Sequence, residues 1–242
     1  MHKCNYFFLL FGLIFTIFNC TKQTSEVDVK PTVVVLIPSV SDTCRVERGI
    51  DAVPESDAIR IEWIPSEDEE VAGYEIYRSI EQRSGPYDVI AGPRVLTASD
   101  SFFVDDLLQL DKRHYYYILA STFDGDKSAP SDTLDYMLIQ KAIDLLPDAE
   151  VFNAKPEFSW VDPNREDAYI IRLMDVAADA YVWISSPIQS TYDPREYVTF
   201  NVDSSSSVDS LVTGAEYIWR VDVVSSKAHC GSESEWVPFR VR

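Results

Sequence analysis

The sequence predicts an all-β protein that consists of two tandem β-sandwiches. Short segments alternate apolar and polar residues, as Ile59–Trp63 does with the sequence IRIEW. Turn-forming residues separate such segments at intervals of roughly 8–12 residues, which is typical of sandwich architecture. No long window shows the 3.6-residue period of a helix. The chain has 242 residues, of which 46% are hydrophobic, so it has enough apolar side chains to form cores.

The same landmarks occur twice along the chain at similar spacing. Three aromatic pairs mark the two copies: Trp63 with Trp160, Tyr74 with Tyr169, and Tyr115 with Tyr217. The members of these pairs are 97, 95 and 102 residues apart. The agreement of three independent offsets indicates a tandem duplication, with about one hundred residues in each copy.

These positions resemble the fibronectin type III pattern, in which a tryptophan, a tyrosine and a Leu-x-x-Gly-x-x-Tyr stretch mark successive strands. The second copy matches that pattern at Leu211, Gly214, Tyr217, Trp219 and Val221. The first copy departs from it, because Leu110 precedes Tyr115 by five residues instead of six. The resemblance covers about residues 45–242 and implies two immunoglobulin-like sandwiches.

The alternation also predicts which side chains form the first core. Trp63 is expected to pack between two sets of inward side chains, which are Tyr74 and Ile76, and Tyr115, Tyr117 and Leu119. Inward positions of an antiparallel sandwich alternate with polar positions that face water. The family resemblance further implies that Tyr115 and Tyr217 form tyrosine corners, in which the hydroxyl bonds to nearby backbone.

The expected organisation has four parts. Residues 1–19 form a signal peptide, 20–43 a polar tether with an extended segment, 44–140 the first sandwich and 141–242 the second. The extended segment contains Val33–Ile37, a β-branched run that favours aggregation when it is left uncovered. We therefore expect this run to pair with the first sandwich or to pack on it.

The N-terminus has the features of an export signal. Lys3 precedes an apolar run, Tyr6–Phe18. A helix of that length covers roughly 20 Å, which is short of the ~30 Å hydrocarbon core of a bilayer. The run ends in Ile17-Phe18-Asn19-Cys20, which resembles the lipobox of bacterial lipoproteins, although the residues at 18 and 19 are bulkier than usual there. The resemblance implies acylation of Cys20; the alternatives are ordinary secretion or an uncleaved anchor.

The charge of the chain limits its partners. Its net charge of −19 excludes broad contact with nucleic-acid phosphates and disfavours docking on anionic lipid headgroups. Acyl chains on Cys20 would instead hold the protein on a membrane. Thr21 stands where an aspartate would specify retention at the inner membrane in the enteric sorting rule. The lipoprotein resemblance therefore points to the outer membrane, on its periplasmic or its surface face.

Catalytic, cofactor and metal chemistry find little support in the sequence. Beyond the signal, histidine occurs only at His114 and His229, about one domain apart. A nucleophilic arrangement needs its members within hydrogen-bond reach, and zinc needs further ligands at suitable spacing. The eight glycines are not clustered as in a phosphate loop. We predict no catalytic residue, no metal and no cofactor, with a hydrolase hidden in the acidic loops as the alternative from the enzyme class.

Two acidic stretches have simpler explanations than calcium sites. Glu67–Glu70 is interpreted as a solvated loop, with a weak calcium or partner patch as the alternative. Residues Asp124–Asp135 imitate the start of an EF-hand, but Ala129 stands where that motif needs glycine. A hairpin turn at Asp124-Gly125 accounts for that stretch better.

Cys44 and Cys230 remain once Cys4 leaves with the signal and Cys20 is acylated. An oxidising envelope favours a disulfide between two such cysteines. However, Cys44 is expected near the start of the first sandwich, and Cys230 in a loop of the second that faces the junction. A bridge requires Cα atoms within about 7 Å of each other. The sequence leaves both a bridge and two free thiols open.

Large aromatic side chains supply the last functional hypothesis. Tyr181 and Trp183 lie on an expected edge strand of the second sandwich, and Trp236 opens its last strand. Exposed rings of this kind stack on sugars or anchor a protein partner, whereas buried ones belong to a core. The sequence thus predicts a non-catalytic cell-envelope lipoprotein that acts as a spacer, scaffold or protein-binding module. The alternative is a carbohydrate-binding lipoprotein of a glycan-capture system that uses these three residues.

Overall fold

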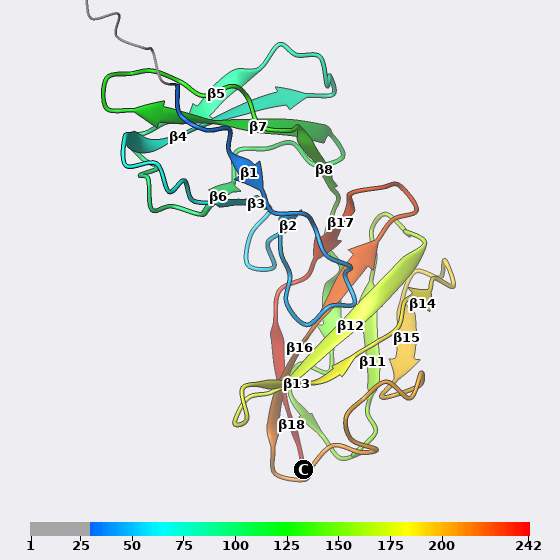
Figure 1. Ribbon diagram of the computed structural model, residues 1–242. Helices are drawn as coiled ribbons and strands as arrows, with labels where there is room; N and C mark the ends of the chain where they lie inside the picture. Colours follow the sequence, from blue (N-terminus) through cyan, green and yellow to red (C-terminus); the bar gives the residue numbers. More distant parts are fainter. Residues whose placement is uncertain (1–29) are drawn as a thin grey trace, which may run out of the picture.

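The computed structural model describes residues 30–242, which form eighteen β-strands joined by turns and loops. Within that range no helix is long and apolar enough to cross a bilayer. The strands build two sandwiches with separate hydrophobic cores (Figure 1). The all-β, tandem-sandwich fold predicted from the sequence is confirmed. The predicted signal peptide, Cys20 and most of the tether lie outside the described residues.

The first sandwich has two antiparallel layers. One layer consists of β1 (Val35–Leu36), β2 (Ile50–Ala52), β3 (Ile59–Ile64) and β6 (Phe102–Asp105). The facing layer has the order β5 (Asp88–Ala91), β4 (Val71–Ile80), β7 (Arg113–Thr122) and β8 (Leu134–Leu138). Because β1 pairs with the central strand β3, the β-branched run Val33–Ile37 is held on the first sandwich, as expected.

The second sandwich repeats this arrangement with split edge strands. Its smaller layer has the order β15 (Glu196–Thr199), β11 (Glu157–Val161) and β9 (Ile143–Leu146). In the larger layer, β12 (Ala168–Asp175) pairs with β13 (Ala180–Ile184) and β14 (Ile188–Gln189) on one side and with β16 (Glu216–Val224) on the other. Beyond β16 lie β17 (Cys230–Glu233), β18 (Val237–Val241) and β10 (Glu150–Val151).

Each core centres on one tryptophan–tyrosine pair. Trp63 and Tyr74 meet edge to face, with ring centroids 5.2 Å apart. Trp160 and Tyr169 repeat that contact at 5.1 Å. All four side chains are buried. The duplicated indole and phenol predicted from the sequence offsets therefore occupy equivalent places in the two cores.

The inward row of β7 differs from the prediction by one residue. The side chains that face the core are His114, Tyr116, Ile118 and Ala120. Tyr115, Tyr117 and Leu119 alternate with them and lie on the outer face of the sheet, where Tyr117 stacks on Tyr77. Because aromatic residues occur on both faces of this strand, the apolar pattern does not fix its register. A one-residue shift exchanges the two faces.

This shift also corrects the tyrosine corner of the first sandwich. In the second sandwich the Tyr217 hydroxyl accepts a hydrogen bond from the Val212 N–H at 3.0 Å, which confirms the predicted corner. In the first sandwich His114 Nε2 accepts from the Gln109 N–H, also five residues earlier, at 3.4 Å. His114 therefore fills the corner that was predicted for Tyr115.

The family pattern is present in the first sandwich with other residue types. The equivalent positions are Leu108, Asp111 and His114 in the first copy and Leu211, Gly214 and Tyr217 in the second. Asp111 and Gly214 both have positive φ, at 61° and 87°. Aspartate tolerates this left-handed conformation better than most residues other than glycine. The first copy therefore keeps the spacing of the pattern but has different residue types at two of its three positions.

We expect His114 to make the stability of the first sandwich depend on pH. Burial, more than the nearby Arg78, lowers the pKa of His114 below its ordinary 6.5 in the folded chain. Protons therefore bind the unfolded chain more readily. The contribution of neutral His114 to the free energy of unfolding is therefore complete above about pH 6.5 and is lost as the pH falls below that value.

The variant His114→Gln tests this, because its amide oxygen can still accept from the Gln109 N–H but does not titrate. The difference in unfolding free energy between wild type and variant is measured in urea between about pH 5 and about pH 7.5. As the pH falls, the variant should become more stable relative to the wild type. A difference that stays constant across this range would contradict the assignment.

The two acidic stretches form loops. Gly125 has a φ of 93°, and its N–H donates to the Thr122 carbonyl at 3.2 Å, which closes the predicted turn after β7. In the other stretch Glu67, Glu69 and Glu70 are exposed between β3 and β4, as expected for a solvated loop.

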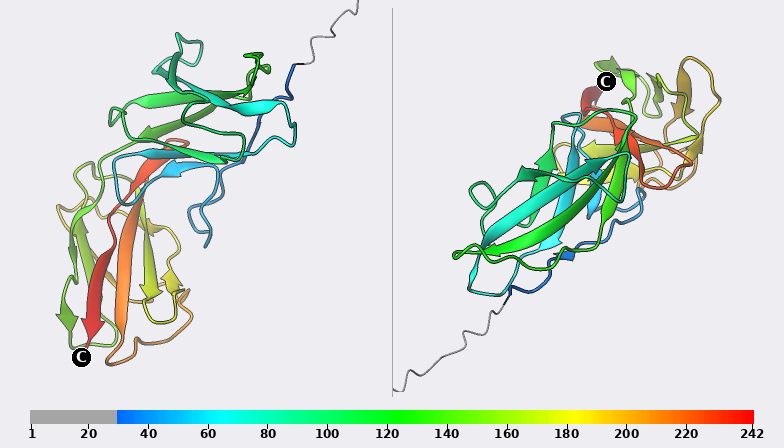
Figure 2. Two further views of the ribbon diagram at one scale, coloured as in Figure 1. Left: turned by 90° about the vertical axis from the view of Figure 1, so that its left-hand side faces the viewer. Right: turned by 90° about the horizontal axis from the view of Figure 1, so that it is seen from above.

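The two sandwiches are joined through their backbones. β17 of the second sandwich pairs in parallel with β8 of the first, with Cys230 opposite Met137 and Gly231 opposite Leu138. The larger layers thereby form one sheet of eleven strands, which bends at the joint (Figures 1 and 2). Glycine is required at 231, because a Cβ there would lie 2.7 Å from the Val223 carbonyl oxygen.

A lysine adds a second attachment between the sandwiches. Lys141 follows β8, and its Nζ donates to the carbonyl oxygens of Val53, Pro54 and Ser56 at 3.1, 2.8 and 2.7 Å. These carbonyls belong to the turn between β2 and β3 of the first sandwich. The segment between the two cores is therefore held by the β8–β17 pairing and by the hydrogen bonds of Lys141, and it is not a free linker.

Candidate functional site at the joint

Two arginines on the outer face of the second sandwich are the centre of the joint. Arg172 on β12 and Arg220 on β16 are directly opposite each other in the antiparallel register. Each is at most 1% exposed, which is rare for arginine unless it is paired. Asp222, two residues after Arg220 on the same face, lies 2.5 Å from Arg172 Nε and 2.8 Å from Arg220 Nε. The sequence analysis did not identify these three residues.

The first sandwich covers these arginines with the long loop between β1 and β2. The backbone carbonyls of Asp42 and Cys44 accept hydrogen bonds from the guanidinium of Arg172 at 2.6 and 2.9 Å. The Glu47 carboxylate contacts both guanidinium groups and lies 2.7 Å from that of Arg172. One segment of the first sandwich therefore satisfies the buried cations of the second.

Acidic groups outnumber these two cations. Glu233 on β17 lies 2.8 Å from Arg220 Nη2, and Asp51 on β2 accepts a hydrogen bond from the Tyr136 hydroxyl at 3.3 Å. Burial, followed by the charges of Glu47 and Asp42, raises the pKa of Asp51 to about 7. Burial and the neighbouring Asp222 also raise the pKa of Glu233, because they oppose the attraction of Arg220. The joint is therefore a partly desolvated site in which carboxyl groups outnumber arginines.

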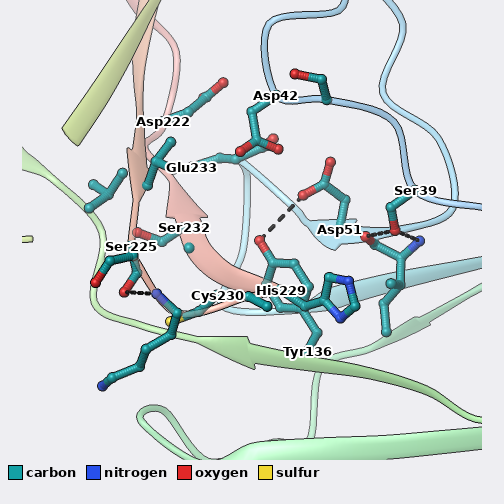
Figure 3. Close-up of a pocket in the computed structure, with 18 of the residues that line it drawn as sticks. Ser39, Asp42, Asp51, Tyr136, Asp222, Ser225, His229, Cys230, Ser232 and Glu233 are labelled. Carbon is teal, nitrogen blue, oxygen red and sulfur yellow. Dashed lines mark hydrogen bonds between the residues drawn. The ribbon is translucent and has the colours of Figure 1, made fainter. Parts of the chain in front are cut away.

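Two cavities flank this acidic cluster. The first has a volume of about 370 Å³, and its wall includes Asp42, Asp51, Tyr136, Asp222 and Glu233, which Figure 3 shows around the opening. The second has a volume of about 340 Å³. Asp51 and Glu233 belong to the walls of both, so the acidic cluster is accessible from two sides. Both volumes are of the size that small-molecule sites have.

The second cavity brings together two of the predicted ligand-binding residues. Tyr181 and Trp236 lie in its wall with ring centroids 6.4 Å apart. Their rings also cover the buried cations: the guanidinium of Arg172 is 5.8 Å from the Tyr181 ring, and that of Arg220 is 5.0 Å from the Trp236 ring. These contacts are cation–π interactions that shield the ion pairs from water.

The prediction of a ligand-binding role for Trp183 is wrong. Its side chain is 1% exposed and packs against Phe158 and Phe200 in the second core. Its indole N–H donates to Asp203 at 2.9 Å, so its polar group is satisfied within the fold. Residues two apart on a regular strand face the same side of the sheet. Tyr181 and Trp183 face different sides, because a bulge shifts the register of β13 between them.

The described cysteines and histidines form no reactive group. Cys44 and Cys230 are both free thiols, the first exposed and the second buried. His114 lies buried at the corner of the first sandwich. His229 is largely exposed near Asp135, at a distance of 3.6 Å. The two histidines therefore occupy different surroundings and do not line a common cavity among those that the described residues form.

No protein-family model and no curated protein matches the sequence. Several solved structures are similar to it. A two-domain fibronectin type III segment of chicken tenascin is 13% identical, with a TM-score of 0.32, over 87% of this chain and 97% of that one. The FN1-FN3 domains of chicken CNTN1 are 14% identical, with a TM-score of 0.38, over 88% of this chain and 69% of that one.

A third similar structure is a β-1,2-glucanase from Parabacteroides distasonis. It is 23% identical, with a TM-score of 0.34, over 47% of this chain and 14% of that one. The chain therefore spans about one seventh of that enzyme. The assignment of tandem fibronectin type III-like sandwiches follows from the strand order and the two cores of this chain.

Proposed function

We propose that this protein is a non-catalytic lipoprotein of the cell envelope and that its two sandwiches act as one stiff spacer that carries a binding surface away from the membrane. The observation that carries this proposal is the joint. A shared sheet edge, the contacts of Lys141 and the arginine–carboxylate network each connect the sandwiches. Flexible tandem modules lack such connections and move relative to one another.

The positions of the chain ends support a spacer. The described chain begins at Lys30 on the side of the first sandwich that is remote from the joint, and Arg242 lies at the far end of the second (Figures 1 and 2). A lipid attached to Cys20 would place the first sandwich near the membrane. The second sandwich, which carries Tyr181 and Trp236, would then stand farther from the membrane than the first.

Replacing Cys20 by alanine tests the anchor. The wild-type chain is expected to occur in the membrane fraction, and its N-terminal peptide should carry acyl chains on Cys20 by mass spectrometry. Cys20→Ala should lack this modification. Cys44→Ala is the matched control and should remain membrane-bound, because Cys44 is a free thiol within the folded part. A mature N-terminus at another residue, or an unmodified Cys20, would refute the lipid anchor.

A specific observation also favours the alternative, a carbohydrate-binding lipoprotein. Tyr181 and Trp236 are partly exposed in the wall of a cavity that also contains Glu47, Arg48 and Glu62. Aromatic faces with charged hydrogen-bonding groups at their rim are suited to the apolar and hydroxylated faces of a sugar. Trp183, in contrast, offers no accessible ring.

Binding of the full chain to a polysaccharide panel tests this alternative. If a glycan is retained, Trp236→Ala should reduce its affinity about thirtyfold or more, because truncating a central aromatic contact removes ~2 kcal/mol or more of binding free energy. Tyr197→Ala is the control, because Tyr197 is an exposed aromatic on an edge strand of the same sandwich. The alternative is rejected if no glycan binds or if both variants bind as the wild type does.

A further inference from the structure

Three carboxylates from separate segments converge at the joint. Glu47 comes from the loop between β1 and β2, Asp222 from β16 and Glu233 from β17. Each has an oxygen that lies within 4.8 Å of an oxygen of both others. Asp222 and Glu233 are 3% and 5% exposed, so they differ from the solvated acidic groups that are common on protein surfaces. Arg220 contacts all three, because like charges at this separation repel unless cations or protons lie among them.

One buried oxygen of this cluster lacks a partner. Glu233 bonds Arg220 through Oε1, but Oε2 has no hydrogen-bond partner within residues 30–242. Asp222 Oδ1 likewise accepts no well-aligned hydrogen bond there, although Arg220 Nε lies 2.8 Å away. Buried polar atoms are nearly always satisfied by protein, water or an ion. Glu233 Oε2 therefore indicates a further ligand at the cluster, whereas Asp222 Oδ1 already has the charge of Arg220 beside it.

The charge balance favours a cation as that ligand. Five acidic residues surround the site, which are Asp42, Glu47, Asp51, Asp222 and Glu233. Within residues 30–242 the cations in ion-pair contact with them are the guanidinium groups of Arg172 and Arg220, and Lys141 acts on Glu233 from farther away. The fully ionised cluster would therefore exceed the charge of its two contacting arginines by three. A divalent cation would remove most of that excess.

The donor set indicates which cation. The three converging groups offer only carboxylate oxygens, and no thiolate or imidazole belongs to the cluster that residues 30–242 form. Hard oxygen ligands favour calcium or magnesium over zinc. Calcium accepts six to eight oxygens in irregular geometry, whereas magnesium requires a near-ideal octahedron. The flanking cavities have room for the waters that would complete the larger shell.

We propose that Glu47, Asp222 and Glu233 form a calcium site at the joint. The ion would link the β1–β2 loop of the first sandwich to β16 and β17 of the second. It would thereby fix the two modules relative to each other, beyond the backbone pairing of β8 with β17. The site does not depend on the lipid anchor or on sugar binding.

Calcium titration of the full chain in detergent, after removal of metal with EDTA, tests the site. Calcium chloride alone should raise the thermal midpoint of the wild type and should give saturable one-site binding by calorimetry. Glu233→Gln should weaken that affinity by about tenfold or more, because affinity follows the number of charged ligands. Glutamine keeps the size of the side chain and an oxygen that can accept from Arg220, so the fold should be retained, which circular dichroism checks.

Glu69→Gln is the matched control, because Glu69 lies in the exposed acidic loop of the first sandwich. Calcium binding by this variant should equal that of the wild type. The proposal is overturned if calcium does not bind the wild type, if Glu233→Gln binds it equally well, or if both variants lose affinity to the same degree. An equal affinity for magnesium would overturn the assignment to calcium.

Discussion

Replacing Arg220 by methionine is expected to lower the free energy of unfolding by about 3–5 kcal/mol. The Arg220 side chain is buried and contacts three carboxylates, which belong to Glu47, Asp222 and Glu233. Methionine has a similar length but leaves these groups with Arg172 as their remaining cation. Removal of one partner from a buried ion pair leaves uncompensated charge, and this cost exceeds the value of the pair itself.

Urea unfolding in the presence of EDTA measures this effect without any contribution from bound metal. Small-angle scattering provides a second readout, because a loosened joint should change the overall dimensions while both cores stay folded. Arg242→Met is the control: Arg242 forms an exposed ion pair with Glu150 at the end of the second sandwich, and its loss should leave stability unchanged. Wild-type stability and dimensions in Arg220→Met would show that the β8–β17 pairing and the Lys141 contacts fix the joint without the arginine network.

Replacing Trp160 by alanine is expected to cost about 3–5 kcal/mol and to unfold the second sandwich. Trp160 is fully buried and meets Tyr169 edge to face. Its removal leaves a cavity that the β-sheet layers on either side cannot close by small shifts, because strand pairing fixes their positions. The energetic loss therefore includes both the transfer of the indole to water and the unfilled space.

Thermal and urea unfolding of the full chain measure this loss, and limited proteolysis locates it. Cleavage in Trp160→Ala should concentrate within residues 141–242. Val212→Ala serves as the control, because Val212 is 61% exposed in the same sandwich and should melt as the wild type does. A near-wild-type melt for Trp160→Ala would refute the assignment of Trp160 to the centre of the core.

Strand alternation predicted the cores wherever one face of a strand is clearly more apolar than the other. Ile59, Ile61 and Trp63 are buried and the intervening Arg60 is exposed, as the sequence indicates. Glu62, the other intervening residue, is buried as well and pairs with Arg48. On β7 the same reasoning failed, because tyrosines occupy both faces and the outer ones stack on Tyr77 of the neighbouring strand. Register there is decided by packing against β4 and β8 and by the corner at His114.

The candidate site was harder to predict from sequence than the cores. Tyr181 and Trp236 were found because exposed aromatics suggest binding, and the structure brings them together. Arg172, Arg220 and Asp222 were missed, because each occupies an outward position that would be solvated in an isolated sandwich. An outward Arg-x-Asp sequence in an otherwise apolar strand was the available signal, and it does not distinguish a solvated ion pair from a buried one.

The sequence by itself determined the two sandwiches, because a period-two pattern and a repeated indole depend on neighbouring residues and on the strands they form. Only the tertiary structure decided which outward charges are buried. Arg172 meets Cys44, and Arg220 meets Glu47, across separations of 128 and 173 residues. Burial at these positions is set by the loop of one module docking on the sheet of the other, and no local pattern in either segment records that contact.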